Sequence, residues 1–257
     1  MTKQHISFSE LKTWAECPYK HKLKYIEGIN GFTGNAFTAF GTAIHSVCEF
    51  IAKGELDPID YDEHFDLAFL CELKKLEEKP ESKMITDMRQ QGREISPSVF
   101  PQLKQHFGNY EVFSTEEMLY ETIEELTYKW HLKGFIDLVI KTSDGKYHIL
   151  DWKSCSWGWA AKRRSEKLVT YQLTLYKKFF CKKHSIDPEL VETHFGLLKR
   201  TAKDNKVEIF RVTSGKRKTT SATKLLTDGC RTIKAKNHVK NRNSCSKCEF
   251  NKSEHCS

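Results

Sequence analysis

The segment that decides the fold runs from residue 134 to residue 153 and reads GFIDLVIKTSDGKYHILDWK. Two strand-like stretches, 134–141 and 146–153, flank the turn letters SDG at 143–145. A three-residue loop with glycine in the left-handed position is a favoured connection between antiparallel strands. The predicted hairpin places Asp137 directly across from Asp151, and Lys153 points to the same face because side chains alternate along a strand.

The two faces of this predicted hairpin differ in character. One face is apolar throughout and carries Ile136, Leu138, Ile140, Leu150 and Trp152. The other face carries Asp137, Asp151 and Lys153. Like charges about 5 Å apart repel unless a cation lies between them, and buried charges without partners cost several kcal/mol.

Two interpretations of the carboxylate pair remain open at this point. Paired carboxylates are typical ligands of Mg²⁺ or Mn²⁺, and such an ion polarises a phosphoryl oxygen and lowers the pKa of a water molecule. Lys153 would then orient that water or stabilise charge on a phosphate. In the alternative, Asp137 and Asp151 lie on an exposed strand edge, and Lys153 is only their salt-bridge partner.

Hydrophobic periodicity outside the hairpin predicts a mixed architecture. Ser7 and Glu10 fit a capping box that begins a helix ending near Cys17, a short helix is expected over 19–26, and Gly28–Gly34 reads as a loop. Helical patterns cover 36–53, 62–79, 83–107, 165–183 and 221–236, and strand patterns cover 116–123, 127–133, 191–200 and 207–213. This order favours one α/β domain over 1–257, with a helical insertion at 55–110.

Composition narrows the class of protein. The 257 residues are 39% hydrophobic and 30% charged, a balance typical of soluble globular proteins. The chain has no run of 18 apolar residues, and its N-terminus lacks the apolar core of a signal peptide, so we expect a cytoplasmic protein with no membrane partner. Nine cysteines in such a chain indicate metal binding or simple burial rather than disulfides.

The net charge of +8 is unevenly distributed along the chain. The residues from Lys199 onward carry a balance of +11, and the first 198 residues carry −3. A basic C-terminal third favours a polyanionic partner such as DNA. A solvated lysine-rich surface is the alternative.

The acidic hairpin also resembles a known signature. Asp137, followed by Asp151-Trp152-Lys153, is similar to the motif of the PD-(D/E)XK nucleases, and more closely to that of their RecB-like branch. That branch includes the iron–sulfur exonucleases of CRISPR adaptation and phage recombination exonucleases. Four further matches occur in the family's order: Ser9-Glu10-Leu11 with Cys17-Pro18, Gly41 to His45, Gln172 to Tyr176, and Cys245 with Cys248 and Cys256.

The resemblance runs from Ser9 to Cys256, with no motif between residues 55 and 115. The chain departs from the family pattern in having Ile136 where proline is usual, and in a longer gap between Cys248 and Cys256. The resemblance implies a restriction-endonuclease-like core, in which a central mixed β-sheet is flanked by helices.

The resemblance also implies roles for individual residues. His45, Asp137 and Asp151 would hold Mg²⁺ or Mn²⁺, with the Trp152 carbonyl as a further ligand, and Lys153 would assist the attack of water. His45 falls on the side of its predicted helix away from the apolar residues. An exposed histidine without a role is the alternative for that position.

Gln172 and Tyr176 lie one turn apart on the predicted helix 165–183. The resemblance implies that they contact DNA or support the active site. A helix that packs on the sheet with its glutamine near an edge is the alternative.

The cysteines of the two chain ends form a third group. Cys17, Cys245, Cys248 and Cys256 match the ligands of the family's [4Fe–4S] cluster, which would join the tail 241–257 to the N-terminal segment. A structural zinc site is the alternative, because C-x-x-C is a chelate spacing used for both. An unliganded tail is the remaining possibility.

Basic and aromatic residues follow the hairpin at Trp157, Lys162, Arg163 and Arg164. This combination suits phosphate contact and base stacking, and a surface loop with buried tryptophans is the alternative. Together the motifs predict a metal-dependent DNA exonuclease that uses one or two metal ions.

The setting that we expect is phage-type recombination or DNA processing, in the host cytoplasm if the chain is phage-encoded. A single-strand annealing protein or a helicase would be its partner. A non-catalytic DNA-binding scaffold of the same fold and an endonuclease are the alternatives.

Overall fold

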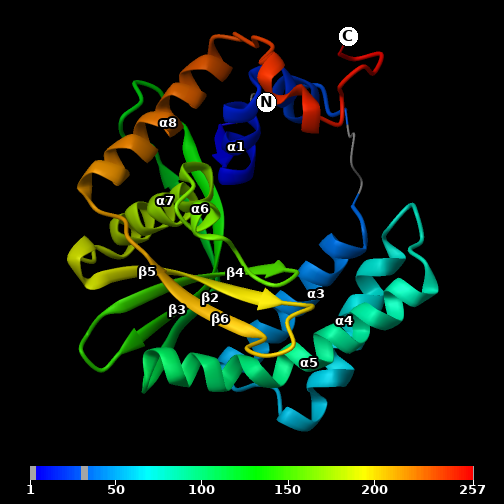
Figure 1. Cartoon of the computed structure of the whole chain (residues 1–257). Coiled ribbons are helices and arrows are strands. Elements are labelled where there is room, and N and C mark those ends of the chain that lie inside the picture. Colours follow the sequence, from blue (N-terminus) through cyan, green and yellow to red (C-terminus); the bar gives the residue numbers. More distant parts are fainter. Residues whose placement is uncertain (1–3, 30–33, 257) are drawn as a thin grey trace. The chain divides into compact units, whose positions relative to one another are not determined.

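Strand β3 (His131–Thr142) pairs with three other strands. In the computed structural model, which describes residues 4–29 and 34–256, its first residues pair in parallel with β1 (His5–Ser7), and its later residues pair antiparallel with β4 (Tyr147–Cys155). β2 (Tyr110–Thr122) also pairs with β3. β5 (Val191–Lys199) lies parallel to β4 and pairs antiparallel with β6 (Val207–Val212), so the six strands form the predicted mixed sheet (Figure 1).

Helices make up most of the remaining structure. The α-helices are α1 (Phe8–Glu16), α2 (Pro18–His21), α3 (Ala36–Lys53), α4 (Tyr61–Lys74), α5 (Ser82–Phe107), α6 (Ala161–Arg164), α7 (Lys167–His184) and α8 (Lys216–Lys234). Shorter turns of helix are η1 (Lys22–Ile26), η2 (Pro58–Asp60), η3 (Pro188–Leu190) and η4 (Arg242–Lys247). None of the helices in the described ranges is long and apolar enough to cross a membrane.

The chain divides into two compact units. The first comprises Met1–Thr33, Met118–Gly134 and Gly215–Ser257, and the second comprises Gly34–Glu117 and Phe135–Ser214. Strands β2 and β3 each contribute residues to both units. The single domain over 1–257 and its insertion at 55–110, a range that contains α4 and α5, stay predictions.

In the second unit, helices cover both faces of the sheet (Figure 1). Helices α3, α4 and α5 share a core with the sheet residues Leu138, Leu150 and Trp152. Helix α7 packs against β4 and β5. The indole of Trp152 lies over Gly196, where a Cβ atom would come within 2.2 Å of the ring, so only glycine fits at that position of β5.

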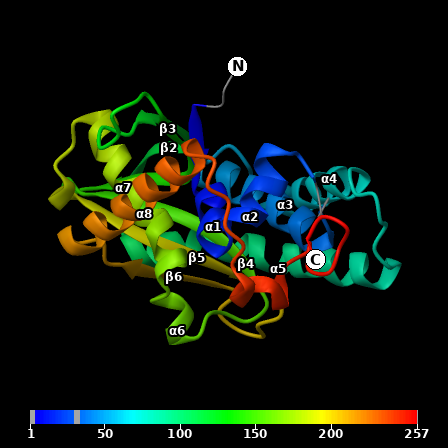
Figure 2. The same cartoon turned by 90° about the horizontal axis from the view of Figure 1, so that it is seen from above.

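In the first unit, α1 begins at the predicted cap. The side chain of Ser7 accepts the backbone N–H of Glu10 at 3.2 Å, which satisfies one of the free donors at the helix start. Helix α8 packs along α1 (Figure 1 and Figure 2). The contact is close at Gly229, where a Cβ would lie 2.8 Å from the side chain of Leu11.

Several predicted boundaries were wrong. The single strand β3 replaces the separate strands predicted at 127–133 and 134–141, because strand pairing is continuous from His131 to Thr142 and residues 124–128 form a turn and a bend. Strand β2 begins at Tyr110 rather than 116, and the short β1 was not predicted. Helix α4 ends at Lys74 rather than 79, and α8 begins at Lys216 rather than 221. The loop predicted over 28–34 lies partly outside the described residues.

Candidate active site

The hairpin of β3 and β4 has the predicted register. Leu138 pairs with Leu150 and Val139 with Ile149, and Gly145 in the connecting loop has a φ of 80°. The same register, continued by one residue, sets Asp137 opposite Asp151. There Asp137 Oδ2 accepts the backbone N–H of Trp152 at 2.6 Å, which fixes the carboxylate of β3 against β4.

Asp151 is held by side chains from β4 and α7. Lys153 Nζ lies 2.5 Å from Asp151 Oδ2, and Gln172 Nε2 donates to Asp151 Oδ1 at 2.9 Å. Gln172 also donates to the hydroxyl of Tyr176 at 3.2 Å, one turn further along α7. Of the glutamine–tyrosine pair that the sequence singled out, Gln172 therefore contacts the carboxylate directly, and Tyr176 contacts Gln172.

His45 of α3 completes the group of predicted site residues. Its Nδ1 lies 3.5 Å from Asp137 Oδ2. Burial, reinforced by the positive charge of Lys153, lowers the pKa of His45 to about 4. The ring is therefore neutral at physiological pH, which is the form in which imidazole binds metal ions.

The environment of the two aspartates disfavours the ionised form of their carboxyl groups. Burial raises the pKa of Asp137 to about 6, and burial together with the negative charge of Asp137 raises the pKa of Asp151 to about 6. Burial opposes the charge of Lys153, yet Asp151 and Asp137 together raise its pKa above the ordinary lysine value. Lys153 is therefore cationic, whereas His45 is neutral. The two carboxylates thus have the positive charge of Lys153 beside them but none from His45.

The donor set fits a divalent cation. Asp151 Oδ2 is buried and, although Lys153 is close, no donor reaches it with hydrogen-bond geometry. An oxygen in that position has a free lone pair, and it lies in the same group as a second, largely buried carboxylate and a neutral imidazole. Carboxylates with one imidazole suit Mg²⁺ or Mn²⁺, and a bound cation would relieve the unfavourable charge of the pair.

A further carboxylate, Glu116 of β2, was missed by the sequence analysis. Although its side chain is exposed, partial burial of the carboxyl group and then the charges of Asp137, Glu49 and Asp151 raise its pKa to about 7. Its φ of 45° is uncommon for a residue other than glycine. None of the motifs found in the sequence includes Glu116, and only the two adjacent glutamates at 116–117 signal an acidic position there.

The adjacent Glu117 has a different environment. It is buried and accepts hydrogen bonds from Ser114, from Lys183 at 2.8 Å and from His184 at 2.5 Å, the last two on α7. Burial alone would raise the pKa of Glu117, but these three partners lower it below the ordinary glutamate value. Glu117 therefore holds β2 against α7, and it is not part of the acidic site.

The residues proposed to contact DNA separate into two groups. Trp157 is 78% exposed, and Lys162 and Arg163 are exposed on α6, where Arg163 stacks on Trp159. Arg164 instead pairs with Glu208 at 2.7 Å and stacks on Phe210. Its charge is therefore already compensated within the protein.

The cysteines predicted to bind a cluster lie in the first unit. Cys17 Sγ accepts the backbone N–H of Asn241 at 3.3 Å, and Cys245 Sγ lies 4.0 Å from the carbonyl oxygen of the same asparagine. The tail also contacts α2 through an ion pair of 3.0 Å between Lys20 and Glu249. These contacts bring the C-x-x-C segment next to Cys17.

The other cysteines lie elsewhere in the chain. Cys48, Cys181 and Cys230 are buried, Cys155 is half-buried at the end of β4, and Cys71 is exposed on α4.

Comparison with known proteins supports the fold. The family model described as "PD-(D/E)XK nuclease superfamily" matches residues 5–253. A solved structure named "Putative exonuclease" from Eubacterium rectale is 14% identical, with a TM-score of 0.57, over 97% of this chain and 88% of that one. The structure of SSO0001 is also 14% identical, with a TM-score of 0.46, over 97% of this chain and 85% of that one. No curated protein sequence matches.

The family match covers nearly the whole chain and includes every residue of the acidic site. The mixed sheet with helices on both faces agrees with the restriction-endonuclease-like core that this family shares. The chain therefore belongs to the PD-(D/E)XK nuclease superfamily.

Proposed function

We propose that this protein is a metal-dependent deoxyribonuclease that removes nucleotides from DNA ends. The observation that carries the proposal is the pair Asp137 and Asp151, of which Asp151 is buried and Asp137 is largely buried, with the cationic Lys153 on one oxygen of Asp151 and the neutral His45 beside Asp137. A structural salt bridge needs only one carboxylate for one lysine, so the second acid is explained by a bound cation.

His45, Asp137 and Asp151 would hold Mg²⁺ or Mn²⁺, with the carbonyl of Trp152 as a further ligand. When bound, such an ion supplies positive charge that polarises the phosphodiester and lowers the pKa of a nearby water molecule. Two further carboxylates, Glu49 and Glu116, interact electrostatically with the site, since the charges of Glu49, Asp137 and Asp151 raise the pKa of Glu116. With these additional carboxylates, the site is compatible with a one-metal or a two-metal reaction.

The remaining residues of the site have separate tasks. Lys153 keeps its proton and offers a positive charge to the phosphate and to the attacking water. Gln172, oriented by Tyr176, holds one oxygen of Asp151 so that the other oxygen faces the cation. Both α7 residues are therefore positioning residues.

DNA would be bound beside the acidic site by exposed groups. Trp157 and the cationic side chains of Lys162 and Arg163 are available for stacking and for phosphate contact. Arg164 contributes less, because Glu208 already compensates its charge.

The preference for an exonuclease rests on the RecB-like motifs, as does a role in phage-type recombination or DNA processing in the cytoplasm. A single-strand annealing protein or a helicase is the partner that fits this role. We also propose that Cys17, Cys245, Cys248 and Cys256 hold a [4Fe–4S] cluster, with structural zinc as the alternative. The contacts of Asn241 with two of these sulfur atoms support a shared site. Iron and zinc analysis of anaerobically purified protein separates the two.

The decisive experiment compares Asp151→Asn with Asp204→Asn, the same change on an exposed loop residue. With end-labelled linear DNA and Mn²⁺, we expect Asp151→Asn to lose more activity than the 10–100-fold typical of changes outside the ligand set, while DNA binding is kept. Asp204→Asn should cleave like the unaltered protein.

The alternatives give different results in the same assay. Cleavage of circular single-stranded DNA would indicate an endonuclease. Folded protein that cuts no DNA with any divalent metal would overturn the catalytic proposal and favour the scaffold.

A further inference from the structure

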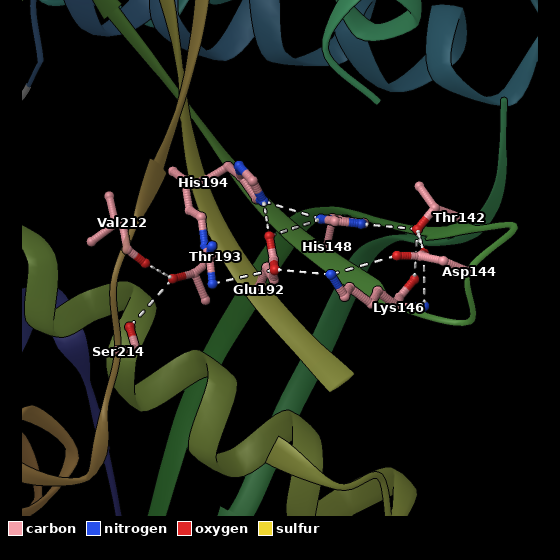
Figure 3. A network of polar contacts seen from close by, with 10 residues as sticks. Thr142, Asp144, Lys146, His148, Glu192, Thr193, His194, Val212 and Ser214 are labelled. Atoms are coloured by element: carbon pink, nitrogen blue, oxygen red, sulfur yellow. Dashed lines mark hydrogen bonds and ion pairs between the residues drawn. The ribbon is translucent and has the colours of Figure 1, made fainter. Parts of the chain in front are cut away.

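A second group of metal-ligand side chains lies on β4 and β5. The parallel register pairs His148 with Glu192, and His194 follows two residues later on the same strand. All three side chains therefore point to one face of the sheet, and Figure 3 shows them converging. Within residues 4–29 and 34–256, this is the one group of three histidine, cysteine or acidic side chains whose ligand atoms all lie within 4.8 Å of one another.

This group is separate from the proposed active site. Because side chains alternate along β4, His148 and Asp151 point to opposite faces of the sheet. His148 shares its face with Leu150 and Trp152, which pack on α3, α4 and α5. A cation bound here would therefore be independent of the one proposed at Asp137 and Asp151.

The distances between the three donor atoms suit a small cation. His148 Nδ1 lies 3.1 Å from His194 Nε2, and Glu192 Oε2 lies 3.9 Å from the first nitrogen and 4.0 Å from the second. Tetrahedral zinc, with bonds of about 2.0–2.1 Å, separates its ligand atoms by about 3.3 Å. Moving the Glu192 carboxylate toward the two rings by roughly half an ångström or slightly more would bring all three donors to the separation of tetrahedral zinc ligands.

The carboxylate of Glu192 is aimed at the histidines without bonding to them. Its Oε1 is held by Arg211 at 3.2 Å and by Lys146 at 3.6 Å, while Oε2 lies beyond hydrogen-bond distance of either ring. Direct hydrogen bonding therefore does not explain why Oε2 faces the two nitrogens. An ion bound by all three atoms does explain it.

The surroundings already orient His148 as a metal ligand. Its second nitrogen, Nε2, lies 3.0 Å from the hydroxyl of Thr142, which donates to Asp144 at 2.5 Å. Metal-bound histidines usually donate their other N–H to such a partner, which fixes the ring and its tautomer. The carboxylate of Asp144 thus supports His148 through the threonine hydroxyl.

Both rings are neutral and shielded from water. Burial, and then the repulsion that a second protonated ring at His148 would exert, lowers the pKa of His194 to about 2, and burial also lowers the pKa of His148. The ring of Phe107 lies 5.0 Å from His148 and 5.1 Å from His194 and covers the pair. His106 packs edge-on against His194, with the two ring centres 5.3 Å apart.

From this geometry we propose that His148, Glu192 and His194 bind a divalent transition-metal cation of the zinc class. Two imidazoles and one carboxylate are ligands that zinc accepts, with water in the fourth position. The ion would join β4 to β5 beside the ring of Phe107 at the C-terminal end of α5. Its role is structural.

Native mass spectrometry of the full-length protein, loaded with Zn²⁺ in the presence of excess Mg²⁺, tests this proposal. We expect His194→Gln and Glu192→Gln each to carry one zinc ion fewer than the unaltered chain. His64→Gln, a histidine of α4 outside the group, is the matched control and should keep the full number. Counting ions per chain separates this site from zinc bound by the cysteines.

A second measurement protects the test against misfolding of the histidine variant. Glu192→Gln and Thr142→Val keep both rings, and circular dichroism reports whether they fold. Zinc titration should show affinity at least about tenfold weaker for Glu192→Gln and about 10–100-fold weaker for Thr142→Val. Equal zinc number and equal affinity in all variants would overturn the proposal, and so would an unaltered protein that binds no zinc at these residues.

Discussion

The hydrogen bond between Gln172 and Asp151 allows a quantitative prediction. Replacing Gln172 by leucine keeps the size of the side chain but removes the donor 2.9 Å from a buried carboxylate oxygen. A hydrogen bond to a charged group is worth about 1.5–3 kcal/mol. That range corresponds to about a 10–100-fold change in an equilibrium constant, which is also the typical effect of removing an outer partner of a metal ligand.

We therefore expect Gln172→Leu to raise the Mn²⁺ concentration for half-maximal cleavage by about 10–100-fold. At saturating Mn²⁺, most of the cleavage rate should return, because the glutamine orients the carboxylate and does not touch the substrate. Initial rates on end-labelled DNA, measured across a series of Mn²⁺ concentrations, give both numbers.

The matched control for this prediction is Gln90→Leu. Gln90 is exposed on α5 and donates to the carboxylate of Glu94 at 3.0 Å. The Gln90→Leu variant therefore also removes a glutamine–carboxylate hydrogen bond. This bond lies on a different helix from Gln172 and involves none of the acidic-site residues. Its Mn²⁺ dependence should match that of the unaltered protein. An unchanged Mn²⁺ dependence in Gln172→Leu would refute the proposed positioning role.

Three further outcomes are expected. Lys153→Met should lower the cleavage rate at saturating Mn²⁺ by about 10²–10³-fold, as for the loss of one charge-stabilising donor, and metal binding measured by titration should persist. Gly196→Ala should destabilise the protein by about 1–3 kcal/mol through overpacking against Trp152, whereas Gly215→Ala, with open space around it, should leave the urea denaturation curve nearly unchanged. Because the folded-state pKa of Glu117 is depressed, its stabilisation is present above the unfolded value near 4.5 and is lost as pH falls through the folded value. Glu117→Gln should therefore be less stable than the unaltered chain at pH 7 and approach it in acid; a constant difference across pH would contradict this.

The sequence predicted best what is local in the chain. The letters SDG define the turn, the turn defines the register, and the register sets Asp137 against Asp151. Helical spacing likewise placed Gln172 and Tyr176 on one face of α7, and the hydrogen bond between them agrees with that spacing.

Two features that depend on long-range strand pairing and that no motif of the resemblance includes were not predicted. His148 and His194 are 46 positions apart and become neighbours through the parallel register of β4 and β5, which no local motif encodes. Glu116 depends on a left-handed backbone conformation in the middle of β2, where the sequence has no glycine to signal it. Both cases required the sheet itself to be known.

The division of the chain has a consequence for the order of folding during synthesis. The second unit, which contains the whole acidic site, is encoded between residues 34 and 214, with only 118–134 assigned elsewhere. The first unit needs residues from 215 onward, including α8 and the C-x-x-C segment. On the ribosome, the segments of the second unit therefore emerge complete while the first unit still lacks the last of its three segments. Because α1 reaches α8 only after about 200 further residues are made, its apolar face depends on the last part of translation for cover.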